Sequence, residues 1–374
     1  MEKRIKVFWV KFMRHAVFLV LVRRILERYN NIDVAVTLKR LSSTDIDDEF
    51  EGTIVYIPDK PRLFPLTGME RMPGLVRNIK KYNPDIIISN LYYTLYSLRS
   101  YLFAKKNNIP FILTTEEKDN SGLFRKILFP IWDSVFGREM LSYARYILAW
   151  SKDSKSFMEN LVEDKAKVKL FLAGVDTSIF RPKQRNYRPN GKIRILMVAR
   201  LVPYKEHATL LLALKKIKEE TSLNFSLNLL SKGNQDLKKE IVKKIKSYGL
   251  ENRVSFLEKV DHSSMVDLYN SHDLLVLPSR GEAIGMAVPE AMACGTCVIV
   301  SDTSGSKDYV EDGSNGLLFI TGNYKDLAEK IVEMSEMDLE EVGRNAADHI
   351  QKNYDINKTA DKLYSIIASA NKFQ

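Results

Sequence analysis

The sequence has 374 residues, of which 45% are hydrophobic and 28% are charged, with 17 glycines and 12 prolines. This balance is typical of a globular protein and excludes a collagenous, low-complexity or disordered chain. Because a single hydrophobic core stops growing at roughly 250–300 residues, we expect two domains. The two cysteines, Cys294 and Cys297, are too few for a disulfide scaffold or a four-ligand zinc site. The longest apolar run near the start, 16–22, is much shorter than the roughly 20 residues that span a bilayer, and we expect a cytoplasmic protein.

The net charge of +10 lies entirely in the first half of the sequence. Residues 1–185 contain 32 Lys and Arg against 21 Asp and Glu, a balance of +11, whereas residues 186–374 contain 25 against 26, a balance of −1. A one-sided basic field attracts anionic lipid, nucleic acid or a phosphorylated substrate. Solubility alone also accounts for such a field, so the charge by itself does not choose a partner.

Apolar runs of strand length alternate with helical patterns along the first half of the sequence. The predicted elements are a strand at 5–10, a helix at 16–28, strands at 33–38 and 85–89, a helix at 96–106 and a strand at 111–114. Strands that alternate with helices over short links indicate a parallel sheet covered by helices.

A polar segment at 181–191, which contains Pro182 and Pro189, is predicted to be a hinge. The alternation then resumes, with strands at 193–198, 226–230, 254–256, 274–277 and 298–300 and helices at 209–219, 237–248, 265–271 and 289–293. The fold class is therefore α/β, with two doubly wound Rossmann-like domains at 1–185 and 186–354. Open parallel sheets bind ligands beyond the carboxyl ends of their strands, so we expect the site in a cleft between the domains.

Two cations follow the predicted strand at 193–198. Arg200 and Lys205 lie on the link between this strand and the next helix. A guanidinium and an ammonium at a strand end suit a diphosphate, the first through its planar fork and the second as a point charge. Two solvated surface cations are the alternative interpretation.

Two carboxylates flank the start of another predicted helix. Pro289 is tolerated only in a first helical turn, so the helix is expected to begin near Gly285 or Met286 and to end at Gly295. Glu282 then precedes the helix and Glu290 lies one turn inside it. The free N–H groups of residues 285–287 would face a ligand between the two carboxylates, with a sugar on one side and a ribose on the other.

Four ordered stretches and one upstream segment form a recognisable pattern. The stretches are VARLVPYKEH at 198–207, FLEKV at 256–260, LPS with the two glutamates at 277–295, and VEDGSNGLL at 310–318, and the upstream segment is AGVDTSIFRP at 173–182. They resemble the retaining, GT-B-fold glycosyltransferases of family 4, also called glycosyl transferases group 1. The resemblance covers residues 140–374 well and the first 140 only in the order of predicted elements.

The resemblance implies a role for each matching residue. Arg200 and Lys205 would hold the donor diphosphate, Glu290 would accept hydrogen bonds from the ribose, and Glu282 would face the donor sugar. The remaining donor-binding candidates are Ile284, Gly285, Met286 and Ala287 beside the sugar, and Lys259 and Val260 beside the base. A C-terminal helix at about 355–374 would pack back on the first domain. Such enzymes use no divalent metal and no other cofactor, because the cations and the helix N-terminus neutralise the leaving diphosphate.

The sequence departs from the family pattern at the first domain's loops. The loop at 11–15 contains no glycine, so the side chains of Lys11, Arg14 and His15 become candidates for acceptor contacts. Where many members have a catalytic His, this sequence has Thr-Glu-Glu at 115–117. Glu116 is the first candidate for the catalytic role and Glu117 an acceptor-side candidate, and a surface acid pair is the alternative.

Other departures and motifs complete the interpretation. The segment Ser-Lys-Gly at 231–233 replaces the usual Gly-Asp-Gly and adds a cation near the base or the phosphates. His207 is expected to pack or cap at the start of a helix, and both cysteines are expected to be structural. The acidic pair in the DID sequence at 45–47 is interpreted as solvated charge and not as a metal motif.

An apolar pair recurs every four residues between 123 and 136, with Arg125, Lys126 and Arg138 as basic flanks. Such a stripe suits a membrane interface, and it equally suits a helix that packs on its own sheet and kinks at Pro130. Together with the basic first half, it favours an acceptor that is lipid-linked or a glycan at the inner face of the membrane. No nucleic-acid motif accompanies the charge, so no nucleic acid is expected as a partner.

The sequence therefore predicts a metal-independent, retaining transferase. It would move a hexose or N-acetylhexosamine from a nucleotide diphosphate sugar to a glycan or lipid-linked hydroxyl, with a UDP-sugar favoured and GDP-mannose next. Two alternatives stay open: a non-catalytic GT-B partner subunit that binds glycan or membrane, and a nucleotide-sugar epimerase of the same fold.

Overall fold

A computed structural model of the protein describes residues 4–11, 16–39, 53–57, 72–116, 130–258, 260–282, 284–303 and 305–372. Residue contacts divide the chain into two compact units. Unit 1 consists of Met1–Gly174 and Ile356–Gln374, and unit 2 consists of Val175–Asp355. The chain therefore crosses between the units twice, and its last helix belongs to the unit in which the chain begins.

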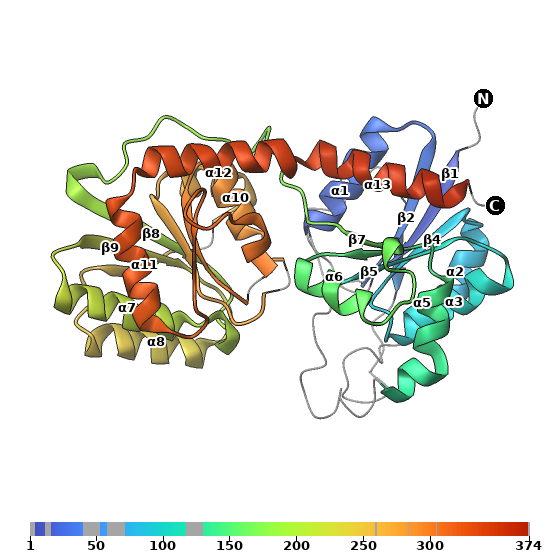
Figure 1. The fold of residues 1–374 in the computed structure, drawn as a ribbon, viewed down its shortest axis with the longest axis horizontal. Helices are drawn as coiled ribbons and strands as arrows, with labels where there is room; N and C mark the ends of the chain where they lie inside the picture. Colours follow the sequence, from blue (N-terminus) through green and yellow to red (C-terminus); the bar gives the residue numbers. More distant parts are fainter. Residues whose placement is uncertain are drawn as a thin grey trace. The chain divides into compact units, whose positions relative to one another are not determined.

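The described strands of unit 1 form a parallel sheet in the order β3-β2-β1-β4-β5-β6-β7 (Figure 1). The central strands are buried along nearly their whole length, which is why they are continuous apolar runs and not alternating patterns. The strands are β1 (Ile5–Val10), β2 (Ile32–Lys39), β3 (Thr53–Ile57), β4 (Ile86–Asn90), β5 (Phe111–Thr115), β6 (Tyr146–Ala149) and β7 (Val168–Leu170).

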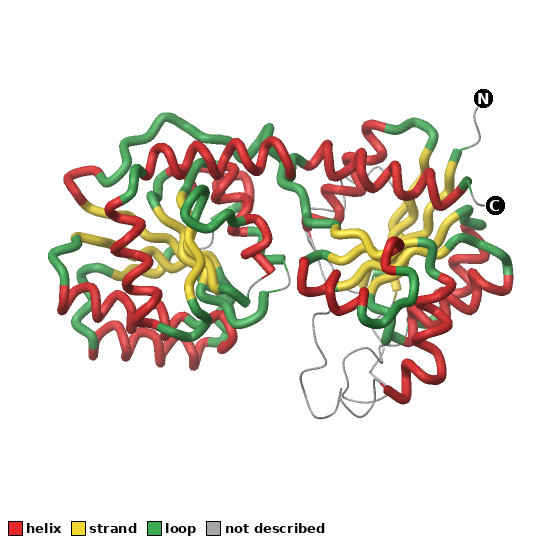
Figure 2. The backbone as a smooth tube through the Cα atoms, in the orientation of Figure 1, coloured by secondary structure: helices red, strands yellow, loops and turns green. Residues whose placement is uncertain are grey.

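Helices cover both faces of this sheet (Figure 2). They are α1 (Ala16–Arg28), α2 (Leu75–Tyr82), α3 (Leu95–Lys106), the π-helix η1 (Asp133–Gly137), α5 (Arg138–Tyr143), α6 (Lys152–Glu159), the 3-10 turn η2 (Lys165–Lys167) and α13 (Ile356–Asn371). The C-terminal α13 packs beside α1, where Arg28 donates to Asp361 over 2.8 Å and the rings of Tyr29 and Tyr364 stack with centroids 3.6 Å apart.

The described strands of unit 2 form a second parallel sheet, in the order β10-β9-β8-β11-β12-β13. They are β8 (Lys192–Val198), β9 (Asn224–Leu230), β10 (Val254–Phe256), β11 (Leu274–Leu277), β12 (Cys297–Ser301) and β13 (Leu317–Phe319). The strand order reverses after β8, because β9 pairs with one side of β8 and β11 with the other. The junction of β8 and β11 is therefore the switch point of this sheet, where ligands of such folds bind.

Helices lie on both faces of the unit 2 sheet, with α7, α8 and α11 on one face and α10 and α12 on the other (Figure 1). The helices and 3-10 turns are η3 (Pro189–Gly191), η4 (Pro203–Lys205), α7 (His207–Glu220), α8 (Gln235–Ser247), η5 (His262–Ser264), α9 (Met265–Asn270), α10 (Ala287–Ala293), η6 (Gly305–Tyr309), α11 (Tyr324–Glu336) and α12 (Leu339–Asn353). The apolar side chains of α7, α8 and α11 meet those of β8 and β9 in one core.

The boundary between the units lies at 174/175 and not at the predicted 185/186. Residues 175–185 pack on unit 2 because their side chains and backbone bond to it. The backbone N–H of Lys183 donates to Asn270 Oδ1 over 2.7 Å, and Arg185 donates to the carbonyl of His272 over 3.0 Å. The polar residues that predict a hinge here instead form these contacts with unit 2.

Within the described ranges, no helix combines the length and the apolar character that a membrane span needs.

Candidate functional site

The candidate site lies at the carboxyl ends of β8 and β11, the switch point of the unit 2 sheet. The segment after β8 carries Arg200 and Lys205, and the segment after β11 carries Glu282. Because the two strands are neighbours and parallel, both segments leave the sheet at the same edge. The structure thus brings together residues that are about 80 positions apart in sequence.

Lys205 and Glu282 form an ion pair in which the ammonium contacts the carboxylate. The lysine is only 6% exposed, since the short turn η4, which starts at Pro203, folds its side chain inward. Burial, and after it the charge of Arg200, lowers the pKa of Lys205 below its ordinary value. An ammonium in this position is costly without an anion beside it. Glu282 supplies that anion here.

The two segments are tied together by contacts that the sequence did not predict. Arg200 donates to the Tyr204 hydroxyl over 2.8 Å, and the backbone N–H of Arg280 donates to the carbonyl of Tyr204 over 2.8 Å. The Arg280 guanidinium also donates to Glu206 Oε1 over 2.6 Å. No local pattern marks the two contacts of Arg280, because each joins segments far apart in the chain, whereas Arg200 and Tyr204 lie on the same segment.

The loop before α10 has room only for a glycine at position 285. Gly285 has a φ of +63°, and a Cβ there would lie 2.0 Å from Ser306 Oγ and 2.8 Å from Glu282 Cγ. The backbone N–H of Gly305 donates to the carbonyl of Glu282 over 2.7 Å, so η6 supports the loop from behind. The close packing fixes the approach of Glu282 to Lys205.

Helix α10 begins and ends where Pro289 and Gly295 predict. It spans Ala287–Ala293, Met286 precedes it, and Gly295 follows with a φ of +71°. The donor-side candidates Ile284, Gly285, Met286 and Ala287 are all half-buried at its start, and Val260 is half-buried on the loop after β10. Lys259 lies outside the described residues.

Glu290 has a partner in α9 that the sequence did not indicate. The hydroxyl of Tyr269, which is fully buried, donates to Glu290 Oε2 over 2.8 Å. Burial raises the pKa of Glu290 to about 7, and the Tyr269 hydrogen bond opposes this shift. The carboxylate therefore changes charge near neutral pH, and Tyr269 sets its orientation.

His207 and the two cysteines belong to the packing of unit 2, as the sequence predicts. His207 begins α7, is buried, and lies 3.0 Å through Nε2 from Ser231 Oγ. Burial lowers the pKa of His207 to about 4, so the imidazole is neutral at physiological pH. Cys294 and Cys297 are buried free thiols whose pKa values burial raises to about 12, far from a reactive thiolate.

A second group of candidates lies at the carboxyl edge of the unit 1 sheet. Lys11 follows β1 and is 3% exposed, with its ammonium 4.8 Å from the ring centroid of Phe18 and 5.6 Å from that of Trp150. Burial lowers the pKa of Lys11, and the charge of Glu116, which follows β5, opposes that shift. The other first-domain candidates, at 14, 15 and 117, lie outside the described residues.

Across the described ranges, His, Cys, Asp and Glu side chains form no group of three or more that could hold a metal ion.

The chain is similar in sequence to several known proteins. Residues 179–353 match the family described as glycosyl transferases group 1. The uncharacterized glycosyltransferase MJ1178 of Methanocaldococcus jannaschii is 30% identical over 296 residues, which are 77% of this chain and 76% of that protein. The D-inositol 3-phosphate glycosyltransferase of Mycolicibacterium smegmatis is 26% identical over 197 residues, which are 50% of this chain and 44% of that protein.

A solved structure extends the likeness to the whole fold. Anabaena Alr3699/HepE, crystallised with UDP and glucose, is 19% identical and superimposes with a TM-score of 0.73 over 98% of this chain and all of that one. At this identity the likeness concerns the fold, which is the GT-B arrangement of two Rossmann-like units.

Proposed function

We propose a specific reaction for this chain, which belongs to the glycosyl transferases of group 1 and is a glycosyltransferase. In the proposed reaction, a hexose or N-acetylhexosamine moves from a nucleotide diphosphate sugar to a hydroxyl of a glycan or lipid-linked acceptor, with retention of configuration. The bond from the anomeric carbon to the diphosphate breaks, the acceptor oxygen bonds on the same face, and its proton passes to the nucleoside diphosphate that leaves.

The observation that carries this proposal is the buried ion pair of Lys205 with Glu282 beside Arg200. The diphosphate would replace Glu282 as the anion against Lys205, and Arg200 would bind the same group through its fork. The carboxylate so released would lie beside the donor sugar and accept from its hydroxyls. Donor binding thus replaces one anion by another instead of burying an unpaired charge.

Glu290 is proposed to accept hydrogen bonds from the vicinal hydroxyls of the ribose. Its orientation by Tyr269 and its position three residues after the first residue of α10 support this role. A UDP-sugar is the favoured donor and GDP-mannose the next. The UDP bound to the similar Anabaena protein supports the first choice.

Lys11 and Glu116 are proposed to serve the acceptor side. Glu116 would orient the acceptor hydroxyl or stabilise positive charge at the anomeric carbon. The ammonium of Lys11, held over two rings, would attract an acceptor with an anionic group. The similarity to the D-inositol 3-phosphate glycosyltransferases, whose name contains a phosphorylated compound, supports a substrate of that charge.

Metal independence is part of the proposal, because two cations and the backbone before α10 would neutralise the leaving diphosphate. The decisive experiment measures nucleotide release from UDP-sugars and GDP-mannose, with membrane extract as acceptor source, in the presence and absence of EDTA. Transfer that survives EDTA supports the proposal. A strict need for Mg²⁺ or Mn²⁺ contradicts the mechanism. Binding without turnover of any donor favours the partner-subunit alternative, and donor conversion without an acceptor favours the epimerase.

Contact with an anionic membrane through unit 1 is proposed from exposed apolar side chains. Ile131 and Val135 are 57% and 54% exposed, and Phe136 beside them is 37% exposed. Arg138 follows on the same surface segment. In vesicle sedimentation of the full chain, Ile131→Ser/Val135→Ser is expected to weaken binding, and added NaCl is expected to weaken it further. Equal sedimentation of wild type and variant removes the membrane contact from the proposal.

A further inference from the structure

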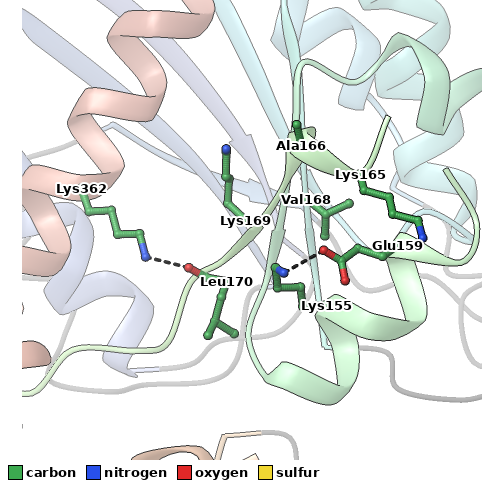
Figure 3. A pocket seen from close by; sticks show the side chains of 8 residues that line it. All are labelled: Lys155, Glu159, Lys165, Ala166, Val168, Lys169, Leu170 and Lys362. Carbon is green, nitrogen blue, oxygen red and sulfur yellow. Dashed lines mark hydrogen bonds and ion pairs between the residues drawn. The ribbon is translucent and has the colours of Figure 1, made fainter. Parts of the chain in front are cut away.

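A basic pocket lies along the edge strand of the unit 1 sheet, with a volume of about 520 Å³ (Figure 3). We call it the lysine pocket. Four lysines and one carboxylate line it, together with three apolar side chains. The lining residues are Lys155, Glu159, Lys165, Ala166, Val168, Lys169, Leu170 and Lys362.

The pocket draws its cations from four elements that meet at this edge. Lys155 comes from α6, Lys165 from η2, Lys169 from β7 and Lys362 from α13. Residues from so many elements converge only through tertiary packing. The pocket contains none of the candidate residues for the transfer reaction, so it is a separate feature of the molecule.

The charges in the pocket are unbalanced. Glu159 is paired with Lys155 over 2.7 Å, and Lys362 donates to the carbonyl of Leu170 over 2.7 Å (Figure 3). Among the described residues, Lys165 and Lys169 form no ion pair with a carboxylate. Burial lowers the pKa of Lys362, and the charge of Lys169 adds to this effect, because a like charge disfavours a second ammonium.

The charged residues next to the pocket, Asp164 and Lys167, make other contacts and do not balance its positive charge. The carboxylate of Asp164 accepts from the backbone N–H of Ala166 over 2.9 Å and thereby caps η2. Lys167 donates to the carbonyls of Leu141, Ser142 and Ala144 at the end of α5, so it points away from the pocket. Within the described ranges, Lys165 and Lys169 make no such contact.

We propose that the lysine pocket binds a phosphate group, carried either by a soluble phosphate ester or by a lipid headgroup. A dianionic phosphate offers several oxygen acceptors to the ammonium groups and offsets the repulsion between Lys169 and Lys362. Lysines on an edge strand also protect a sheet from pairing with another chain, but that role requires neither a concave site nor lysines from three other elements.

The test compares three variants with the wild-type full chain. The pocket variant Lys165→Gln/Lys169→Gln removes the two unpaired cations. The control Lys80→Gln/Lys81→Gln makes the same charge change on the exposed end of α2 in the same unit. The third variant, Glu159→Gln, removes the carboxylate that competes for Lys155.

Binding is measured with two probes at low salt. Calorimetry uses inorganic phosphate, and sedimentation uses vesicles of phosphatidylcholine with phosphatidic acid against phosphatidylcholine alone. The pocket variant is expected to bind about tenfold more weakly, the control within about twofold of wild type, and Glu159→Gln more tightly than wild type. Because the proposed diphosphate site also attracts phosphate, the quantity of interest is the difference between pocket variant and control.

The two probes identify the source of the phosphate. Pocket-dependent binding of inorganic phosphate points to a soluble ester, and pocket-dependent binding of the vesicles alone points to a headgroup. The proposal is overturned if wild type binds neither probe, or if the pocket variant and the control lose affinity equally. Melting temperatures of all variants show whether a loss reflects unfolding.

Discussion

The Tyr269 hydroxyl donates a 2.8 Å hydrogen bond to Oε2 of Glu290, and this contact joins α9 to α10, whose first residues belong to the candidate donor site. Tyr269 is fully buried, with its ring 6.2 Å from that of Phe180. A buried carboxylate needs such a donor, since desolvation opposes its ionised form. The contact therefore links the packing of α9 to the charge of the residue proposed to bind ribose.

The first prediction concerns the pH dependence of donor binding. Burial raises the pKa of Glu290 to about 7, so the protonated form prevails below that pH and the carboxylate above it. Because only the carboxylate accepts hydrogen bonds from both ribose hydroxyls, the donor KM is expected to fall several-fold as the pH rises from about 6 to about 8. Initial rates over this range test it. In Glu290→Gln the KM is expected to be high and independent of pH, and a pH response identical to wild type would assign the titration to another group.

The second prediction concerns Tyr269→Phe. Removing the hydroxyl takes away a hydrogen bond that favours the ionised carboxylate, so the pKa of Glu290 is expected to rise further. The pH midpoint of the donor KM would shift upward by about half a unit to one unit, with kcat at high pH nearly unchanged. An unshifted midpoint in a folded variant would show that Tyr269 only packs α9.

The third prediction concerns Lys205→Ala. Loss of one preorganised cation against a leaving group is expected to lower kcat/KM by about 10² or more. Lys243→Ala, an exposed lysine of α8, serves as control and is expected to keep wild-type rates. Steady-state kinetics with matched circular dichroism separates a catalytic effect from unfolding. Wild-type rates in folded Lys205→Ala would refute the assignment to the diphosphate.

The fourth prediction compares two glycines with positive φ. A Cβ on Gly285 would collide with Ser306 and Glu282, whereas a Cβ on Gly313, at φ +79°, has nothing within 4 Å. Gly313→Ala is expected to lower the free energy of unfolding by about 1 kcal/mol through backbone strain alone. Gly285→Ala is expected to cost more than that and to weaken donor binding, because Glu282 must move. Denaturant unfolding and donor titration measure both effects, and equal costs at the two positions would contradict the packing argument.

The fifth prediction concerns Glu116→Gln. If Glu116 orients the acceptor or stabilises the anomeric carbon, kcat is expected to fall by roughly 10² or more while donor affinity, proposed to reside in unit 2, is unchanged. Donor affinity by calorimetry and kcat by initial rates give the two quantities. A change confined to the donor KM, or no change, would transfer the role to Glu117 or His15.

The sequence alone predicts the elements whose boundaries are marked locally. Strand β11 and the second halves of β1 and β8 are continuous apolar runs because both of their faces are covered by helices. Helix α10 is bounded by a proline that only a first turn tolerates and a glycine at positive φ. The order of these elements also implies parallel sheets, and therefore which loops share an edge.

The sequence does not predict elements that are short or polar. Strands β6 and β7 span only Tyr146–Ala149 and Val168–Leu170, and β7 has an exposed lysine at its centre, so neither produces an apolar run long enough to recognise. The unit boundary was misplaced for a related reason. Residues 175–185 look like a linker by composition, but their polar groups bond to unit 2.

The sequence by itself determined which residues carry charge at the carboxyl ends of β8 and β11, since apolar runs and turn residues are local signals. Only the tertiary structure decided their partners. Lys205 with Glu282, Tyr269 with Glu290 and the four lysines of the lysine pocket each come from segments separated along the chain. Such pairs leave no local periodicity in the sequence, because they arise from sheet order and helix packing, which depend on the free energy of the whole core.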